Sequence, residues 1–100
     1  MDAMKTVLRM KTNNRTSPNR WAQCETDLPE SLSIHKGDRC QVSAELNDVG
    51  LTVADVFISR ADRTRYVLFT DVTEDYLETI VTRTKEWQEI GPFSHPNDKD

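Results

Sequence analysis

The sequence predicts a small α+β domain in which an antiparallel meander of five or six strands, an open sheet or a small barrel, is covered by one C-terminal helix. Three observations favour this fold. The chain has 100 residues, the usual size of one domain. Threonine and valine, which suit strands, are abundant. The clearest helical spacing of apolar residues lies near the C-terminus. We expect a single domain over residues 1–92 and a flexible tail over 93–100.

The first 30 residues are expected to form two strands. Residues 4–12 alternate, with Met4, Leu8 and Met10 on one face and basic side chains on the other, which indicates a half-buried strand. The composition of residues 13–19 is typical of a loop. Residues 20–26 are interpreted as a second strand, which the segment 27–30 ends because Pro29 cannot donate a ladder hydrogen bond.

The middle of the chain predicts two more strands and two turns. Residues 31–34 form a short alternating piece, and 35–38 supply a glycine turn. Residues 39–46 alternate most clearly, which would direct Cys40, Val42, Ala44 and Leu46 inward. Residues 47–50 are typical of a hairpin connection.

Residues 51–59 allow two interpretations. The two halves of this segment are apolar at opposite parities, so a single strand needs a bulge near Ala54 and Asp55. The alternative is a helix with Thr52 as its N-cap. We favour the strand because turn signals flank it. Residues 65–72 are apolar at both parities, which predicts a central strand covered on both faces.

The C-terminal helix is predicted from caps and spacing. Thr73 is a suitable N-cap, and Gly91 with Pro92 would end the helix. The apolar stripe comprises Leu77, Ile80, Val81, Thr84 and Trp87.

Charge and hydropathy restrict the function. The net charge of −4 argues against a protein that coats DNA, yet the first 22 residues are strongly basic, so a local basic surface is possible. No apolar run has the length of a membrane span, and we find no signal peptide. We therefore expect a cytoplasmic protein with reduced thiols and no membrane partner.

Catalytic and metal-binding motifs are weak. Cys24, His35, Cys40 and His95 are the residue types that zinc prefers, but their spacing contains no paired ligand motif. His35 and Cys40 flank one turn, but neither an orienting group nor an oxyanion hole has a sequence signature. Nucleotide-binding and hydrolase motifs are missing as well. The sequence thus predicts no enzyme, no metal and no cofactor.

The turns carry the strongest functional signal. If every turn reverses the chain, alternate turns meet at one end of the sheet and gather arginines into a basic pole beside two aromatic residues. Arginine, tryptophan and tyrosine are enriched in protein-binding hot spots. We expect a non-enzymatic protein-binding module, a stoichiometric inhibitor or adaptor, that docks an acidic partner. The alternatives are a small β domain that binds RNA or single strands, and a merely solvated set of turns. The predicted binding residues are Arg15, Arg20, Trp21, Lys36, Arg39, Arg60, Arg63, Arg65 and Tyr66.

Overall fold

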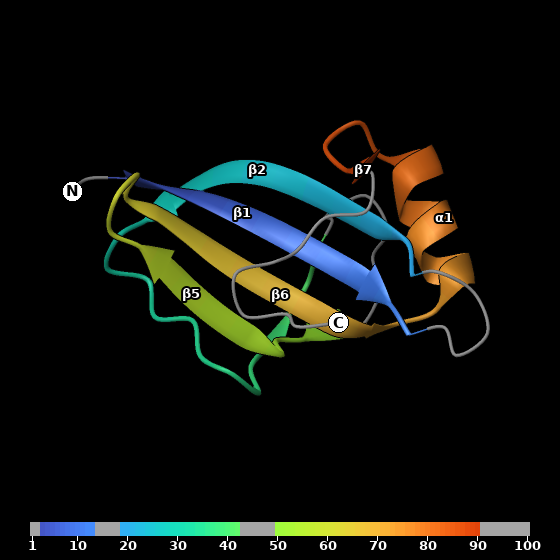
Figure 1. Cartoon of the computed structure of the whole chain (residues 1–100), viewed down its shortest axis with the longest axis horizontal. Helices are drawn as coiled ribbons and strands as arrows, with labels where there is room; N and C mark the ends of the chain where they lie inside the picture. The colour runs from blue at the N-terminus through green and yellow to red at the C-terminus, as the bar shows by residue number, and fades with distance from the viewer. Residues whose placement is uncertain (1–2, 14–18, 43–49, 91–100) are drawn as a thin grey trace.

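The computed structural model describes residues 3–13, 19–42 and 50–90. Within these ranges the chain forms one main sheet, a small two-stranded ribbon and one helix (Figure 1). The elements in chain order are β1 (Ala3–Thr12), β2 (Trp21–Pro29), β3 (Arg39–Cys40), β4 (Leu51–Thr52), β5 (Asp55–Ser59), β6 (Thr64–Val72), α1 (Glu74–Arg83) and β7 (Gln88–Ile90).

The main sheet is mixed. Its strand order is β5-β6-β1-β2-β7, and β1 lies parallel to β6 while every other neighbouring pair is antiparallel. The α+β class and the helix near the C-terminus are confirmed, but the predicted meander is wrong, because β6 crosses over to pair with β1. The sheet is also open, with β5 and β7 at its two edges, and does not form a barrel.

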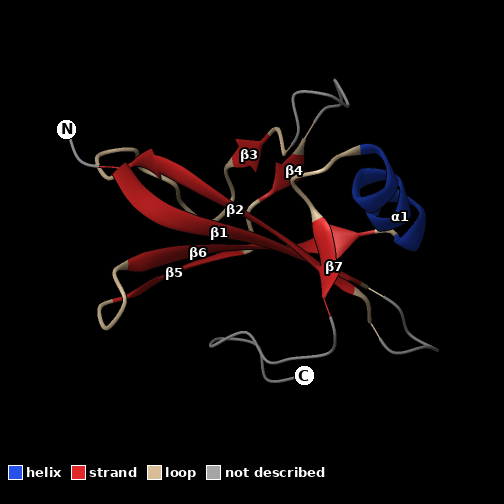
Figure 2. Ribbon diagram, turned by 90° about the horizontal axis from the view of Figure 1, so that it is seen from above, coloured by secondary structure: helices blue, strands red, loops and turns tan. Residues whose placement is uncertain are grey.

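One face of the main sheet, here called the inner face, carries most of the core. Alternation places Met10, Ala22, Val67 and Phe69 on this face, and all four are buried. The α1 helix and the β3–β4 ribbon pack against it (Figure 2). The opposite, outer face contains Lys5, Arg9, Gln23 and Tyr66 on neighbouring strands. The alternation predicted for residues 4–12 is therefore confirmed.

The α1 helix begins as predicted and ends early. The Thr73 hydroxyl accepts the Tyr76 N–H at 3.1 Å, and Glu74 and Asp75 follow in the first turn, where the helix dipole favours acids. The helix stops at Arg83, because the backbone of Thr84 is extended. The Thr84 N–H and hydroxyl both donate to the carbonyl of Ile80, at 3.1 and 2.7 Å. The helix is too short to cross a membrane, and no other helix occurs in the described chain.

Trp87 was wrongly assigned to the helix. It lies between α1 and β7, yet it is fully buried, and its indole N–H donates to the carbonyl of Val42 at 3.0 Å. Trp87 therefore fixes the chain that follows β3 against the core, and the residues after it add β7 to the edge of β2.

The segment 51–59 is extended, so the helix alternative is wrong. β4 pairs with β3, and β5 pairs with β6. The Ala54 N–H donates to the carbonyl of Leu68 at 2.8 Å, while Asp55 is the register partner of the same residue. Two consecutive residues thus oppose one, as at a β-bulge. The single strand predicted over 51–59 is wrong, however, because β4 belongs to the ribbon and β5 to the main sheet.

Other predictions for the middle of the chain are wrong or fall partly outside the described residues. Residues 31–34 are not a strand, and β2 continues to Pro29 instead of ending at residue 26. Of the strand predicted over 39–46, β3 retains only two residues, and residues 43–46 lie outside the described ranges together with most of the predicted hairpin. The tail over 93–100 lies outside them as well.

Candidate functional site

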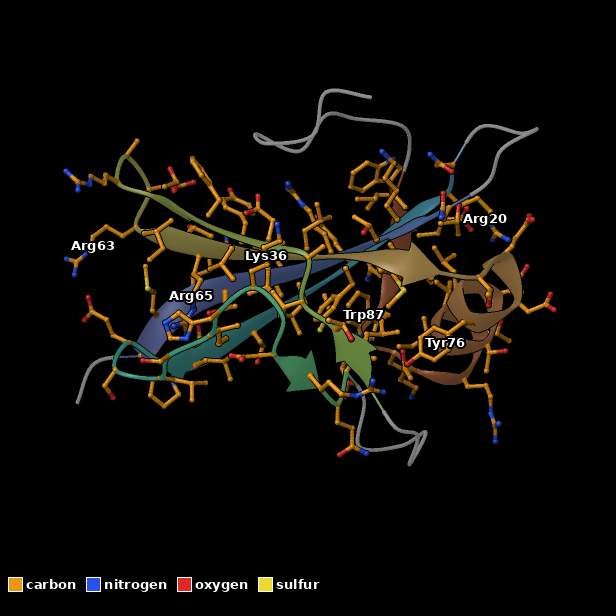
Figure 3. All side chains as sticks on the ribbon, turned by 90° about the horizontal axis from the view of Figure 1, so that it is seen from below. Arg20, Lys36, Arg63, Arg65, Tyr76 and Trp87 are labelled. Carbon is orange, nitrogen blue, oxygen red and sulfur yellow. The ribbon has the colours of Figure 1, made fainter. Side chains whose placement is uncertain are left out.

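The predicted basic pole does not exist as one cluster. Because β6 is parallel to β1, with Lys5 opposite Thr64, the β5–β6 turn over residues 60–63 lies beside the start of β1. Arg20 lies at the other end of β1, where its carbonyl accepts the Thr12 N–H. A ten-residue strand separates the two ends by roughly 30 Å. Arg63 and Arg20 accordingly occupy opposite ends of the molecule in Figure 3. Arg15 lies outside the described residues.

Arg20 is part of a structural ion cluster. Its guanidinium makes two hydrogen bonds to Glu89 of β7, at 2.7 and 2.8 Å, and lies 3.6 Å from Glu74 and 3.5 Å from Glu78 of α1. The hydrogen bond from Arg20 holds the pKa of Glu89 below its ordinary value. This cluster connects β2, β7 and α1, so Arg20 is engaged within the fold.

Arg65 is a second structural arginine. Its side chain lies on the inner face and is 3% exposed. The guanidinium donates to the Leu32 carbonyl at 2.8 Å, to the Pro29 carbonyl at 3.2 Å and to the Thr6 hydroxyl at 3.2 and 3.3 Å. These partners are uncharged. Arg65 therefore fixes the segment that follows β2 against the inner face of the sheet. Its positive charge is buried between that segment and the sheet.

The two predicted aromatic residues lie on the outer face, each beneath a cation. The Arg9 guanidinium lies 4.7 Å from the ring centroid of Tyr66, and the Lys11 ammonium lies 5.3 Å from that of Trp21. Trp21 is 3% exposed. Cation–π contacts of this kind stabilise the sheet surface by about 0.5–1 kcal/mol each. Tyr66 reaches the β5–β6 turn, because its hydroxyl donates to the Asp62 carboxylate at 3.4 Å, whereas Trp21 lies at the other end of β1.

The β5–β6 turn presents two exposed cations. Arg60 and Arg63 both face solvent, and the Arg63 side chain is 79% exposed. Arg63 makes a long ion pair with Glu30, at 3.8 Å. An exposed pair of this kind contributes about 0–1 kcal/mol. Lys36 and Arg39 are exposed too, but they lie toward the opposite end of β5, where the Gly37 N–H donates to the Val53 carbonyl.

The backbone of Arg63 is in the left-handed region, with φ of 53°. A side chain other than glycine or asparagine costs about 1–2 kcal/mol in this conformation. The turn also contains Asp62, whose pKa is held below its ordinary value first by a hydrogen bond from Ser59. The backbone conformation of Arg63 therefore costs stability, and among the described residues an exposed ion pair with Glu30 offsets little of this cost.

Two exposed apolar residues lie near this turn, and the sequence did not predict either of them as a surface residue. Leu32 and Ile58 are the exposed large hydrophobic residues of the described chain, at 45% and 53%. Ile58 lies two residues before Arg60, and Leu32 lies two residues after Glu30, the ion-pair partner of Arg63. The parity of β5 could have revealed Ile58, but nothing local indicated that Leu32 lies near the turn.

Thiol and metal chemistry have little support among the described residues. Burial raises the pKa of Cys24 and of Cys40, so neither thiol is activated as a nucleophile. Both are free thiols. In ranges 3–13, 19–42 and 50–90 no three His, Cys, Asp or Glu side chains gather as metal ligands. His95, a member of the predicted zinc set, lies outside these ranges.

A polar hollow of about 400 Å³ lies at the end of β1. The described residues that line it are Lys11, Thr12, Asn13, Asn19 and Thr70. None of these side chains is a carboxylate, thiol or imidazole, so they offer hydrogen bonds and one positive charge but no acid–base pair.

Comparisons with family models, with curated proteins and with solved structures find no match for this chain. Its function must therefore be argued from the geometry above.

Proposed function

We propose that this chain is a non-enzymatic protein-binding module, an adaptor or stoichiometric inhibitor, that docks an acidic partner at the β5–β6 turn. The observation that carries the proposal is Arg63, a strained and highly exposed arginine with little structural benefit. Residues kept in costly backbone conformations concentrate at functional sites. Arg60 lies in the same turn and adds a second exposed guanidinium.

Charge supports an acidic partner. The turn and its surroundings contain Arg60, Arg63 and the buried Arg65 against the carboxylates of Glu30 and Asp62, in a chain whose net charge is −4. A guanidinium binds a carboxylate through two parallel hydrogen bonds. Leu32 and Ile58 add apolar contact area beside these charges, and such a combination is common in protein interfaces.

The nucleic-acid alternative has less support. Binding of single strands relies on aromatic rings that stack with bases. Trp21 is buried, and Arg9 lies over the ring of Tyr66, although the Tyr66 hydroxyl reaches Asp62 of the turn. We keep this alternative as an outcome of the experiment.

The test is affinity capture from the native host with the full chain, followed by purification of the captured protein and measurement of its Kd. In the variant R60E/R63E we expect loss of capture and at least a tenfold rise in Kd. The matched control R83E/K85E makes the same change in net charge at exposed positions beyond the turn. Arg65 is left intact because it is buried.

Capture that R60E/R63E leaves unchanged would overturn the proposal. So would a shift of a mixed RNA and DNA ladder that R60E/R63E abolishes, because the turn would then bind nucleic acid. Circular dichroism of all three proteins establishes that each variant is folded.

A further inference from the structure

The two edges of the main sheet differ. β7 has three residues, and its Glu89 is held by Arg20. β5 has five residues, and no described strand pairs with its outer edge. Proteins usually block an exposed edge with charged side chains, proline, a bulge or a very short strand. In β5 the charged Asp55 and the irregular pairing of Ala54 lie at the beginning of the strand, and its centre is Val56, Phe57 and Ile58.

An unblocked edge strand is a template for strand addition. Alternate residues of an edge strand direct their N–H and C=O groups outward, where an extended peptide can form main-chain hydrogen bonds. Side chains of the added strand would then lie beside those of β5, two residues apart on each face. On the inner face, the side chain of the added strand would lie beside Ile58, which is more than half exposed.

The chemistry around the edge selects the peptide. Ile58 is 53% exposed, so an apolar side chain of the added strand would bury it. Beyond Ser59, the strand leads into the exposed Arg60 and Arg63. Positive charge therefore lies at one end of the edge.

From these observations we propose that β5 binds an extended segment of a partner protein by strand addition, with an apolar residue beside Ile58 and an aspartate or glutamate that reaches Arg60 or Arg63. This inference rests on the proposed function and specifies its partner. Charge complementarity favours such a segment over a second copy of this chain, since β5 and the following turn would bring arginine to the interface from both copies.

The probe is a display library of random nine-residue peptides selected on the immobilised full chain. We expect enrichment of peptides with alternating apolar residues and acidic residues toward one end. The best peptide is then synthesised and its Kd measured by fluorescence anisotropy. Methylation of its backbone nitrogens, one at a time, should weaken binding at least tenfold at alternate residues and leave the residues between them unaffected, because only every second N–H faces β5.

The matched variants are I58K and T79K. Both introduce one lysine at an exposed position, the first on β5 and the second on α1. We expect I58K to weaken the peptide at least tenfold and T79K to have no effect.

Three results would overturn the inference: selected peptides without acidic residues, binding that tolerates methylation at every nitrogen, or a dimer of the chain alone that I58K dissociates in sedimentation. The last result would make the occupant a second copy. If the native partner is lost with R60E/R63E but the peptide results fail, the proposed function stands and strand addition alone is wrong. If the native partner binds R60E/R63E as tightly as the wild type, the proposed function itself is wrong.

Discussion

The Arg65 guanidinium donates to the Leu32 carbonyl at 2.8 Å, across 33 residues of sequence. This bond and the one to Pro29 fix the chain after β2 on the inner face of the sheet. Five predictions follow from this and other contacts.

Replacement of Arg65 by methionine should lower the free energy of unfolding by about 2–4 kcal/mol, because the buried Thr6 hydroxyl and two partly buried carbonyls lose their donor. R65K should be nearly as unstable, since an ammonium cannot reproduce the planar fork of donors. Urea unfolding measures both. R60M, at an exposed position, should change stability by less than about 0.5 kcal/mol. An R65M variant as stable as R60M would contradict the structural role of Arg65.

Replacement of Arg63 by asparagine should leave stability unchanged or raise it by up to about 1 kcal/mol, because asparagine tolerates the left-handed backbone at φ of 53°. The lost ion pair with Glu30 is exposed and offsets little of this gain. The same urea measurement applies. A clear loss of stability in R63N would show that the arginine is structural and would remove the main support for the binding site.

The Arg20 cluster should make stability depend on pH. Glu89 has a pKa below its ordinary value of 4.5 in the folded chain, so it stabilises the fold above that pH and the contribution disappears as the pH falls through the folded pKa. R20Q should be about 1 kcal/mol less stable at neutral pH and lose less stability than the wild type on acidification. Unfolding from pH 7 to about 3 tests this. K5Q, which removes the exposed Lys5–Glu25 pair, should retain the wild-type acid response.

Two glycines should respond differently to alanine. Gly37 and Gly50 both have positive φ, at 95° and 84°, so each substitution is strained by about 1 kcal/mol. A Cβ at Gly50 would additionally lie 2.5 Å from the Cys40 carbonyl oxygen, whereas nothing lies within 4 Å of one at Gly37. G50A should therefore be clearly less stable than G37A in thermal unfolding. Equal midpoints of thermal unfolding for G50A and G37A would mean that the β3–β4 ribbon accommodates the added Cβ without a loss of stability.

The two thiols should react slowly with iodoacetamide. Burial raises the pKa of both, so the thiolate fraction is small at neutral pH and the rate should increase as the pH is raised. Cys40 is the less buried and should be labelled first. Mass spectrometry after timed labelling gives both rates. Rapid modification of Cys24 in the native chain would contradict its burial.

The sequence predicted the elements whose signals are local. Alternation located β1, apolar residues at both parities located β6, and the Thr73 cap located the start of α1, because each signal depends on neighbours a few residues away. The end of α1 was misjudged, since Thr84 and Trp87 are buried as the helical spacing requires but lie in a loop. Burial alone does not distinguish the two.

The pairing of β1 with β6 could not be derived in this way, because it joins residues about 59 positions apart. Because the sequence analysis assumed a meander, it also placed Arg20 and Arg63 at the same end of the sheet. The burial of Arg65 did have a signal, since it shares parity with Val67 and Phe69, which face the core. The prediction of Arg65 as a binding residue rested on its charge and ignored its position on the inward face of the strand.

The parallel pairing of β1 with β6 also has a consequence for how the chain folds. The hairpin of β1 and β2 can form from the first 29 residues, but one side of β1 must await residues 64–72. Contacts of such long sequence separation slow folding, and an unpaired central strand is prone to aggregation meanwhile. On the ribosome, β1 is therefore made well before β6 and is completed only after β6 has been synthesised.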